Sequence, residues 1–161
     1  MTITLARVDD RVIHGQTTTR WSKDRPVQGI IVVSDTVAKD ELRKKVLKAA
    51  AGHLKLGIYP VCDGPEKIKL AKESQKEFFL ISDSPQNFAE LTKMGVDFGP
   101  LNVGCMNTRP GSQVIGKTLA IDKNDYDAFE TMENAGVDMY FQVIPSDDKK
   151  NWSDLKNKFQ K

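Results

Sequence analysis

Short apolar runs rich in β-branched residues alternate along this chain with longer polar segments of helical periodicity, a pattern typical of repeated β-α units. Several runs lack an in-and-out alternation, as expected for parallel strands that helices cover on both faces. We therefore predict an α/β fold with an open, mainly parallel β-sheet and helices on both faces. The predicted strands span residues 3–7, 29–33, 56–61, 77–81, 100–103, 118–121 and 138–143.

One helix is predicted from Val37 to Ala51, with Asp35 or Thr36 capping its first turn. Apolar residues recur within it at helical spacing and predict a buried face made of Leu42, Val46, Leu47 and Ala50. Further helices are predicted over residues 15–21, 65–74, 85–94 and 124–135. The polar tail after Pro145 forms a short terminal helix or a loose end, with docking residues Trp152, Leu155 and Phe159.

Length and charge limit the function classes. A chain of 161 residues is long enough for one substantial core, so we expect a single domain over residues 1–161. Its 24 Lys and Arg residues against 22 Asp and Glu residues leave a net charge of +2, which argues against nucleic acid as a partner.

The cellular compartment follows from the apolar runs and the cysteines. The longest apolar runs, at 30–33 and 78–81, are too short to span a bilayer, and the first residues lack a signal-peptide pattern. We therefore expect a cytoplasmic protein. The two cysteines, Cys62 and Cys105, form no C-x-x-C pair, so a reduced chain without metal is the simplest interpretation.

Ligands of open α/β sheets bind outside the carboxyl ends of the strands, which directs attention to the loop after the first predicted strand. There, Arg7 and Arg11 flank two aspartates, and His14 follows where the next helix should begin. Arginine grips a phosphoryl group through two oxygens, and the start of a helix offers unpaired N–H groups. The loop is predicted to hold a phosphate with Arg7, Arg11, Gly15 and Gln16.

Histidine supplies a nitrogen nucleophile at neutral pH, so His14 is the predicted acceptor of a phosphoryl group. Asp10 is the candidate for orienting its ring through a hydrogen bond, with Asp9 as the alternative. Arg7 and Arg11 would supply the positive charge that phosphoryl transfer needs. From the residue types alone, such a loop is usually a solvated turn with ion pairs worth about 0–1 kcal/mol, and a histidine at a helix start is more often a cap or a surface residue.

A second set of candidates lies in or just after the predicted strand at 100–103. Asn102, Gly104 and Met106 would line the phosphate pocket or meet a partner, and a tight turn leaving the strand is the alternative.

The ordered motif RVDDRVIHGQ resembles the active-site segment of IIB components of the mannose/fructose/sorbose class of sugar phosphotransferase systems. Other segments are similar to the same family at the same relative places, so the resemblance covers nearly the whole chain. Besides residues 7–16, the matching segments are residues 19–21, 31–35, 37–40, 101–106 and 143–146.

The resemblance implies a protein-phosphohistidine-sugar phosphotransferase. A phosphorylated IIA domain would pass its group to the Nδ1 nitrogen of His14, and His14 would pass it to a sugar held by membrane IIC and IID subunits. It also implies the α/β fold predicted above, no metal or cofactor, and peripheral association with the transporter. Mannose, fructose, sorbose and N-acetylgalactosamine all stay open as the sugar, as does the oligomeric state. Cys105 departs from the small residue expected there.

Such a relay needs a shallow site that two partners can reach, and Val12, Ile13 and Thr17 to Thr19 would form part of its docking rim. Ordinary packing of the first helix is the alternative interpretation of these residues.

A response-regulator receiver is the best rival from another class. Asp9 and Asp10 would be its acidic pair, Asp63 its phosphoacceptor and Ser82 its hydroxyl residue. Against it, no Lys-Pro follows the strand at 100–103, the chain continues through further strands, and His14 would have no role. A nucleotide-binding module ranks last, since no glycine-rich phosphate motif is present.

Overall fold

The computed structural model describes residues 2–161, apart from the side chains of Gln16 and Thr17. A seven-stranded sheet has the order β3-β2-β4-β1-β5-β8-β9, and its pairings are parallel except that of β8 with β9. This confirms the predicted fold class. The strands are β1 (Ile3–Val8), β2 (Gly29–Val33), β3 (Lys55–Tyr59), β4 (Phe78–Ser82), β5 (Leu101–Val103), β8 (Met139–Phe141) and β9 (Lys150–Asn151).

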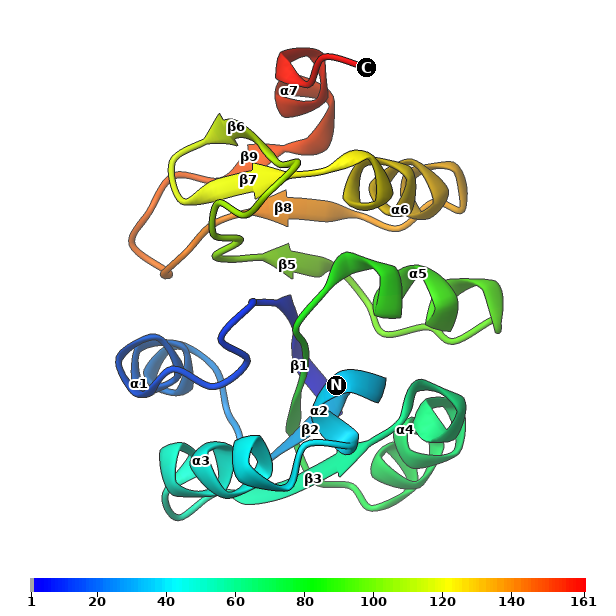
Figure 1. Cartoon of the computed structure of the whole chain (residues 1–161). Coiled ribbons are helices and arrows are strands. Elements are labelled where there is room, and N and C mark those ends of the chain that lie inside the picture. Colours follow the sequence, from blue (N-terminus) through cyan, green and yellow to red (C-terminus); the bar gives the residue numbers. More distant parts are fainter. Residues whose placement is uncertain (1) are drawn as a thin grey trace.

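Helices cover both faces of the sheet (Figure 1), and each face has its own apolar cluster. One face carries α1 (Gly15–Asp24), α2 (Asp35–Ala38) and α3 (Glu41–Ala51). The other carries α4 (Gly64–Glu73), α5 (Pro85–Lys93) and α6 (Lys123–Asn134). Within residues 2–161, no helix is long and apolar enough to cross a bilayer.

The helix predicted over residues 37–51 is two helices, α2 and α3. Ser34 caps the first through its hydroxyl oxygen, and Asp40 caps the second through its carboxylate. Each cap satisfies a backbone N–H that would otherwise lack a partner at a helix start. The predicted caps Asp35 and Thr36 were therefore wrong.

The buried face of α3 also differs from the predicted one. Leu47 and Ala51, one turn apart, pack against the sheet, whereas Leu42 is 74% exposed and Val46 59% exposed. The prediction that Leu42 and Val46 belong to the core was wrong.

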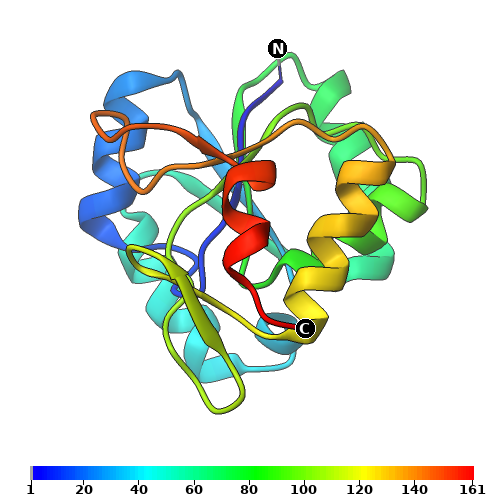
Figure 2. The ribbon, with the colours of Figure 1, turned by 90° about the horizontal axis from the view of Figure 1, so that it is seen from above.

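The chain beyond β5 differs most from expectation. Residues 118–121 were predicted as a strand of the main sheet, but β7 (Leu119–Ile121) pairs with β6 (Gln113–Gly116) in a separate antiparallel hairpin. Both β6 and β9 were missed. The tail folds as α7 (Trp152–Leu155) and a 3₁₀ turn at Lys156–Lys158, close to α6 (Figure 2). Its predicted docking residues are buried: Trp152, Leu155 and Phe159.

Candidate functional site

Residues 9–14, called here the 9–14 loop, follow β1 at the carboxyl edge of the sheet. Because β1 lies between β4 and β5, the loop emerges at the middle of this edge. The Asp9 amide donates to the carbonyl of Ser82 at 3.0 Å, and the Asp10 amide donates to the carbonyl of Cys105 at 3.0 Å. The loop is thus tied to the chain leaving both neighbouring strands.

A group of polar side chains lies beneath the loop, and we call it the buried network. Arg7 donates through Nη2 and Nε to Asp9 Oδ2, at 2.9 and 3.3 Å. Its Nη1 donates to Asn102 Oδ1 and, at 3.3 Å, to the carbonyl of Gln142, which also accepts from Asn102 Nδ2 at 3.0 Å. Arg7, Asp9 and Asn102 are at most 2% exposed. These contacts compensate for burying an arginine and a carboxylate.

Two further residues shape the space around the Arg7 guanidinium. A Cβ atom at Gly104 would overlap it, so a side chain there is excluded while Arg7 keeps this position. On the other side the guanidinium carbon lies 5.6 Å from the centre of the Trp21 ring, a cation–π distance. The indole N–H of Trp21 donates to the carbonyl of Val143 at 2.9 Å, which fixes α1 against the chain after β8.

Three residues of the expected phosphate site lie beneath the surface. Arg7 and Asn102 were predicted to bind a phosphoryl group, but they are 2% and 0% exposed and bond each other. Gly104, predicted for the same pocket, makes room for the guanidinium instead. In this arrangement none of the three offers a donor to a group at the surface.

Above the network the 9–14 loop makes a tight turn. Asp9 Oδ1 accepts from the Arg11 amide at 3.0 Å, and the Asp9 carbonyl accepts from the Val12 amide at 2.9 Å. Val12 has a φ of +62°, an uncommon conformation for a β-branched residue and one that costs about 1–3 kcal/mol. Its side chain and that of Ile13 are buried, at 2% and 5% exposure. Both therefore pack in the core and do not form the predicted docking rim.

His14 lies at the outer end of the loop, immediately before α1, and its side chain is partly exposed. Its carbonyl accepts from the Thr18 amide at 2.8 Å, in the first turn of the helix. Its Nε2 atom lies 3.2 Å from Nη1 of Arg11, whose side chain is exposed. The structure thus brings together two predicted site residues, an imidazole and a guanidinium, at the surface.

Neither aspartate of the loop orients the imidazole in the predicted way. Asp10 Oδ2 accepts from the Asn107 amide at 2.6 Å, while its Oδ1 is buried without a hydrogen-bond partner. Asp10 therefore ties the loop to the segment after β5. The Asp9 carboxylate, the alternative candidate, bonds Arg7 and the Arg11 amide.

Arg43 is a site residue that the sequence analysis missed. From the first turn of α3 it donates through Nη2 to the Asp10 carbonyl at 3.0 Å and reaches Asp83 at 3.4 Å through Nη1. Its side chain is 29% exposed, so it braces the 9–14 loop from outside. Arg43 stands 33 residues beyond Asp10, and the one available signal was that its helix starts after a parallel strand, at the same sheet edge.

The remaining predicted residues lie around the histidine. Gly15 is the exposed first residue of α1, whose first N–H groups lack helical partners. The side chain of Gln16, also predicted to bind phosphate, lies outside the described residues. Burial raises the pKa of the Cys105 thiol, and the charge of nearby Asp9 adds to this. The thiol of Cys105 is therefore protonated at neutral pH.

Fold and site together define a doubly wound α/β domain that presents a histidine at the carboxyl edge of its sheet. The family model described as "PTS system sorbose subfamily IIB component" matches residues 3–161. The chain therefore belongs to this family of sugar phosphotransferase components.

Individual relatives agree with the family assignment. The sorbose-specific EIIB component of Lacticaseibacillus casei is 38% identical over 148 residues, 91% of this chain and 90% of the relative. The mannose-specific EIIAB component of Escherichia coli is 34% identical over all of this chain but 50% of its own length. The crystal structure of the IIB domain of the Klebsiella pneumoniae sorbose permease, 34% identical, superposes with a TM-score of 0.91 and covers 99% of both chains.

Proposed function

We propose that this chain is a phosphocarrier that accepts a phosphoryl group on His14 from a phosphorylated IIA domain. It then passes the group to a sugar held by membrane IIC and IID subunits, with which it associates peripherally. The observation that carries the proposal is the partly exposed His14 imidazole beside Arg11, on a loop fixed from below. Membership of the IIB family supports the same relay.

In the transfer step, Nδ1 of His14 attacks the phosphorus, a P–N bond forms, and the P–N bond to the donor histidine breaks. The neutral attacking ring carries its proton on Nε2. Arg11 also presents a donor to Nε2 in the structure, and two donors cannot share that contact. We infer that the exposed Arg11 side chain turns from the ring to the phosphoryl oxygens. There it joins the free N–H groups at the start of α1, including that of Gly15.

The buried network has a positioning role in this proposal. Arg7 holds the Asp9 carboxylate, which in turn holds the amide of Arg11 and so the turn that presents His14. Such positioning lowers the barrier because phosphoryl transfer depends more on alignment and charge than on covalent help.

The partner assignment draws on the relatives. The mannose-specific relative is named as an EIIAB component, and this chain matches half of it, which supports a IIA domain as the donor. The relatives carry different sugar names, sorbose and mannose. We therefore assign the choice of sugar to the membrane subunits.

The topology weighs against the receiver alternative. Asp63 follows β3, the edge strand, which is separated from β1 by β2 and β4. Neighbouring strands are about 4.8 Å apart, so three steps place this strand end about 14 Å from Asp9 and Asp10. An acidic pair could not share a metal with a phosphoacceptor at that distance.

The test is the intact mass of the chain after incubation with phosphoenolpyruvate, the general phosphotransferase proteins and a IIA domain. We expect one phosphoryl adduct that brief acidification removes, because phosphohistidine is acid-labile. The adduct should be absent from His14→Ala and present in His53→Ala, which removes the chain's other histidine. No adduct on the wild type, together with labelling of Asp63 by acetyl phosphate and magnesium, would overturn the proposal.

A further inference from the structure

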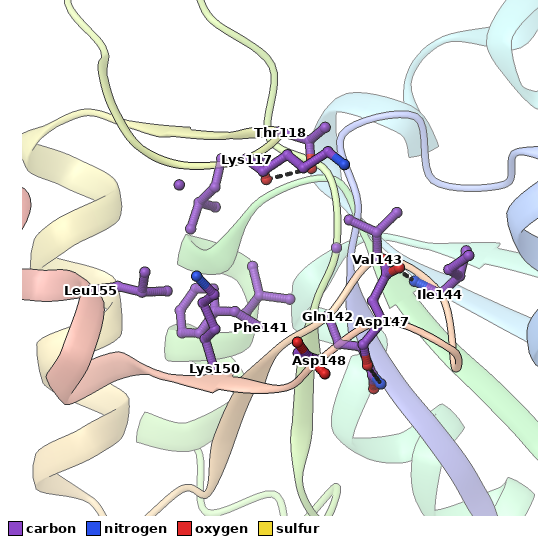
Figure 3. Close-up of a pocket in the computed structure, with 14 residues that line it drawn as sticks. Lys117, Thr118, Phe141, Gln142, Val143, Ile144, Asp147, Asp148, Lys150 and Leu155 are labelled. Atoms are coloured by element: carbon purple, nitrogen blue, oxygen red, sulfur yellow. Dashed lines mark hydrogen bonds between the residues drawn. The ribbon is translucent and has the colours of Figure 1, made fainter.

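A hollow of about 530 Å³ opens at the carboxyl ends of β5 and β8 (Figure 3). Its walls are the turn of the β6–β7 hairpin, the segment 142–148, β9 and α7, and we call it the hairpin hollow. Its volume falls within the 300–1,000 Å³ typical of small-molecule sites. His14 and Arg11 are not among its lining residues, so it is distinct from the site described above.

The floor of the hairpin hollow is apolar. Leu119 comes from the hairpin, Phe141 from β8 and Leu155 from α7, and their exposures are 5%, 6% and 2%. An aromatic ring with two aliphatic neighbours provides a surface for the C–H face of a ring-shaped ligand.

Charged side chains stand on opposite walls. Lys117 lies on the hairpin turn, while Lys150 and Asp148 lie across the hollow from it (Figure 3). None of these three forms an ion pair within residues 2–161. The carboxylate of Asp147, which also lines the hollow, accepts a hydrogen bond from the Ile144 amide at 3.3 Å. Lys117 and Lys150 both line the hollow and have exposed side chains, whose charge attracts a multiply charged anion, and the Asp148 carboxylate can accept hydrogen bonds from hydroxyl groups.

We propose that the hairpin hollow binds a phosphorylated monosaccharide. The phosphate lies between Lys117 and Lys150, the hydroxyl groups face Asp148, and one face of the sugar ring lies on Phe141. This inference rests on the proposed function, because a sugar phosphate is the product that the relay delivers. It adds a product-binding site beside the phosphocarrier site.

A short chain of contacts joins this hollow to the 9–14 loop. The side-chain amide of Gln142 lies at the hollow and donates to the carbonyls of Pro145 and Asp147, at 3.1 and 2.7 Å. The carbonyl of the same residue accepts from Arg7 in the buried network. A ligand that shifts the segment 142–148 would therefore also shift the Gln142 carbonyl that accepts from Arg7.

The test is isothermal titration calorimetry of the unphosphorylated full chain with mannose 6-phosphate, mannose and inorganic phosphate. We expect mannose 6-phosphate to bind at least about tenfold more tightly than either fragment. Lys117→Glu and Lys150→Glu should each weaken its binding by about tenfold or more. The matched control Lys149→Glu makes the same charge change next to Lys150 but outside the hollow, and should bind as the wild type does.

Any other outcome contradicts the proposal that the hairpin hollow binds a phosphorylated monosaccharide. Equal binding of inorganic phosphate would show a general anion site, and equal binding of mannose would remove the role of the lysines. The absence of binding heat with every ligand would also contradict the proposal. So would a loss of affinity for mannose 6-phosphate in Lys149→Glu as large as that in Lys150→Glu. His14→Ala should bind mannose 6-phosphate like the wild type, because the hollow does not include this residue. Failure of the hollow and failure of the relay are therefore separate results.

Discussion

An arginine lies on each side of the 9–14 loop, one beneath it and one on its outer face, and the two differ in what they contact. Beneath the loop, Arg7 is 2% exposed and bonds three partners. On the outer face, Arg11 is exposed, and its guanidinium contacts the His14 ring. Two arginines four residues apart thus lie in different surroundings: Arg7 supports the turn from below, and Arg11 lies at the surface beside His14, where we propose that it meets the phosphoryl group.

The largest effect should come from removing the buried arginine. Arg7→Ala leaves the buried Asp9 carboxylate without its ion pair, and we expect the free energy of unfolding to fall by about 3–5 kcal/mol. Urea denaturation measures this. Arg11→Ala is the matched control and should stay within about 0.5 kcal/mol of the wild type. Equal free energies of unfolding for the two variants would contradict the structural role assigned to Arg7.

The exposed arginine should matter for transfer. We expect Arg11→Ala to slow phosphorylation of His14 by a IIA domain by about 100-fold, because a positioned donor to the transferring group is lost. Rapid-quench measurement of the phosphorylated fraction gives the rate. Arg11→Lys keeps the charge without the planar fork and should recover part of the rate. An unchanged rate in Arg11→Ala would remove this residue from the transfer step.

A smaller effect should follow from filling the space beside Arg7. In Gly104→Ala the new methyl group overlaps the guanidinium, and we expect a loss of about 1–3 kcal/mol in stability. Gly15→Ala is the control, since its added Cβ meets no described atom within 4 Å apart from its chain neighbours and the backbone of its own helix. Thermal unfolding compares the two. If Gly104→Ala were as stable as the wild type, the Arg7 guanidinium would have to move aside at little cost in free energy.

The smallest effect concerns the thiol next to the network. Because the thiolate is the reactive form and burial raises the pKa of Cys105, its alkylation at neutral pH should be slower than that of an ordinary thiol. The rate should rise only at a pH above the usual thiol range. In Cys62→Ser the remaining thiol is Cys105. Its alkylation by iodoacetamide can be measured by mass spectrometry between pH 7 and pH 10. The variant Cys105→Ser leaves Cys62 as the reference thiol. If Cys105 were alkylated at pH 7 as fast as this reference, the expectation would be contradicted.

Local sequence predicted the positions of the first five strands along the chain well, because each strand and helix carries its own periodicity. It also placed His14 at the carboxyl edge. The depth of Arg7 was not predictable in this way, because Asn102 and Gln142, which bury it, are 95 and 135 residues away. The faces of α3 were misassigned because Leu42 and Val46 have core-like side chains at exposed positions.

The long sequence separation between Arg7 and its partners Asn102 and Gln142 also affects when the site forms during folding. The segment that carries His14 belongs to the first β-α unit of the domain, so it leaves the ribosome before the rest of the domain. Its support does not exist until residue 142 has been made and β1 has paired with β4 and β5. Contacts between such distant residues form slowly, because closing long loops is entropically unfavourable. A segment that is made before the rest of this domain therefore reaches its supported shape only after distant residues have packed beneath it, and a well-formed 9–14 loop reports that the domain has folded as far as residue 142.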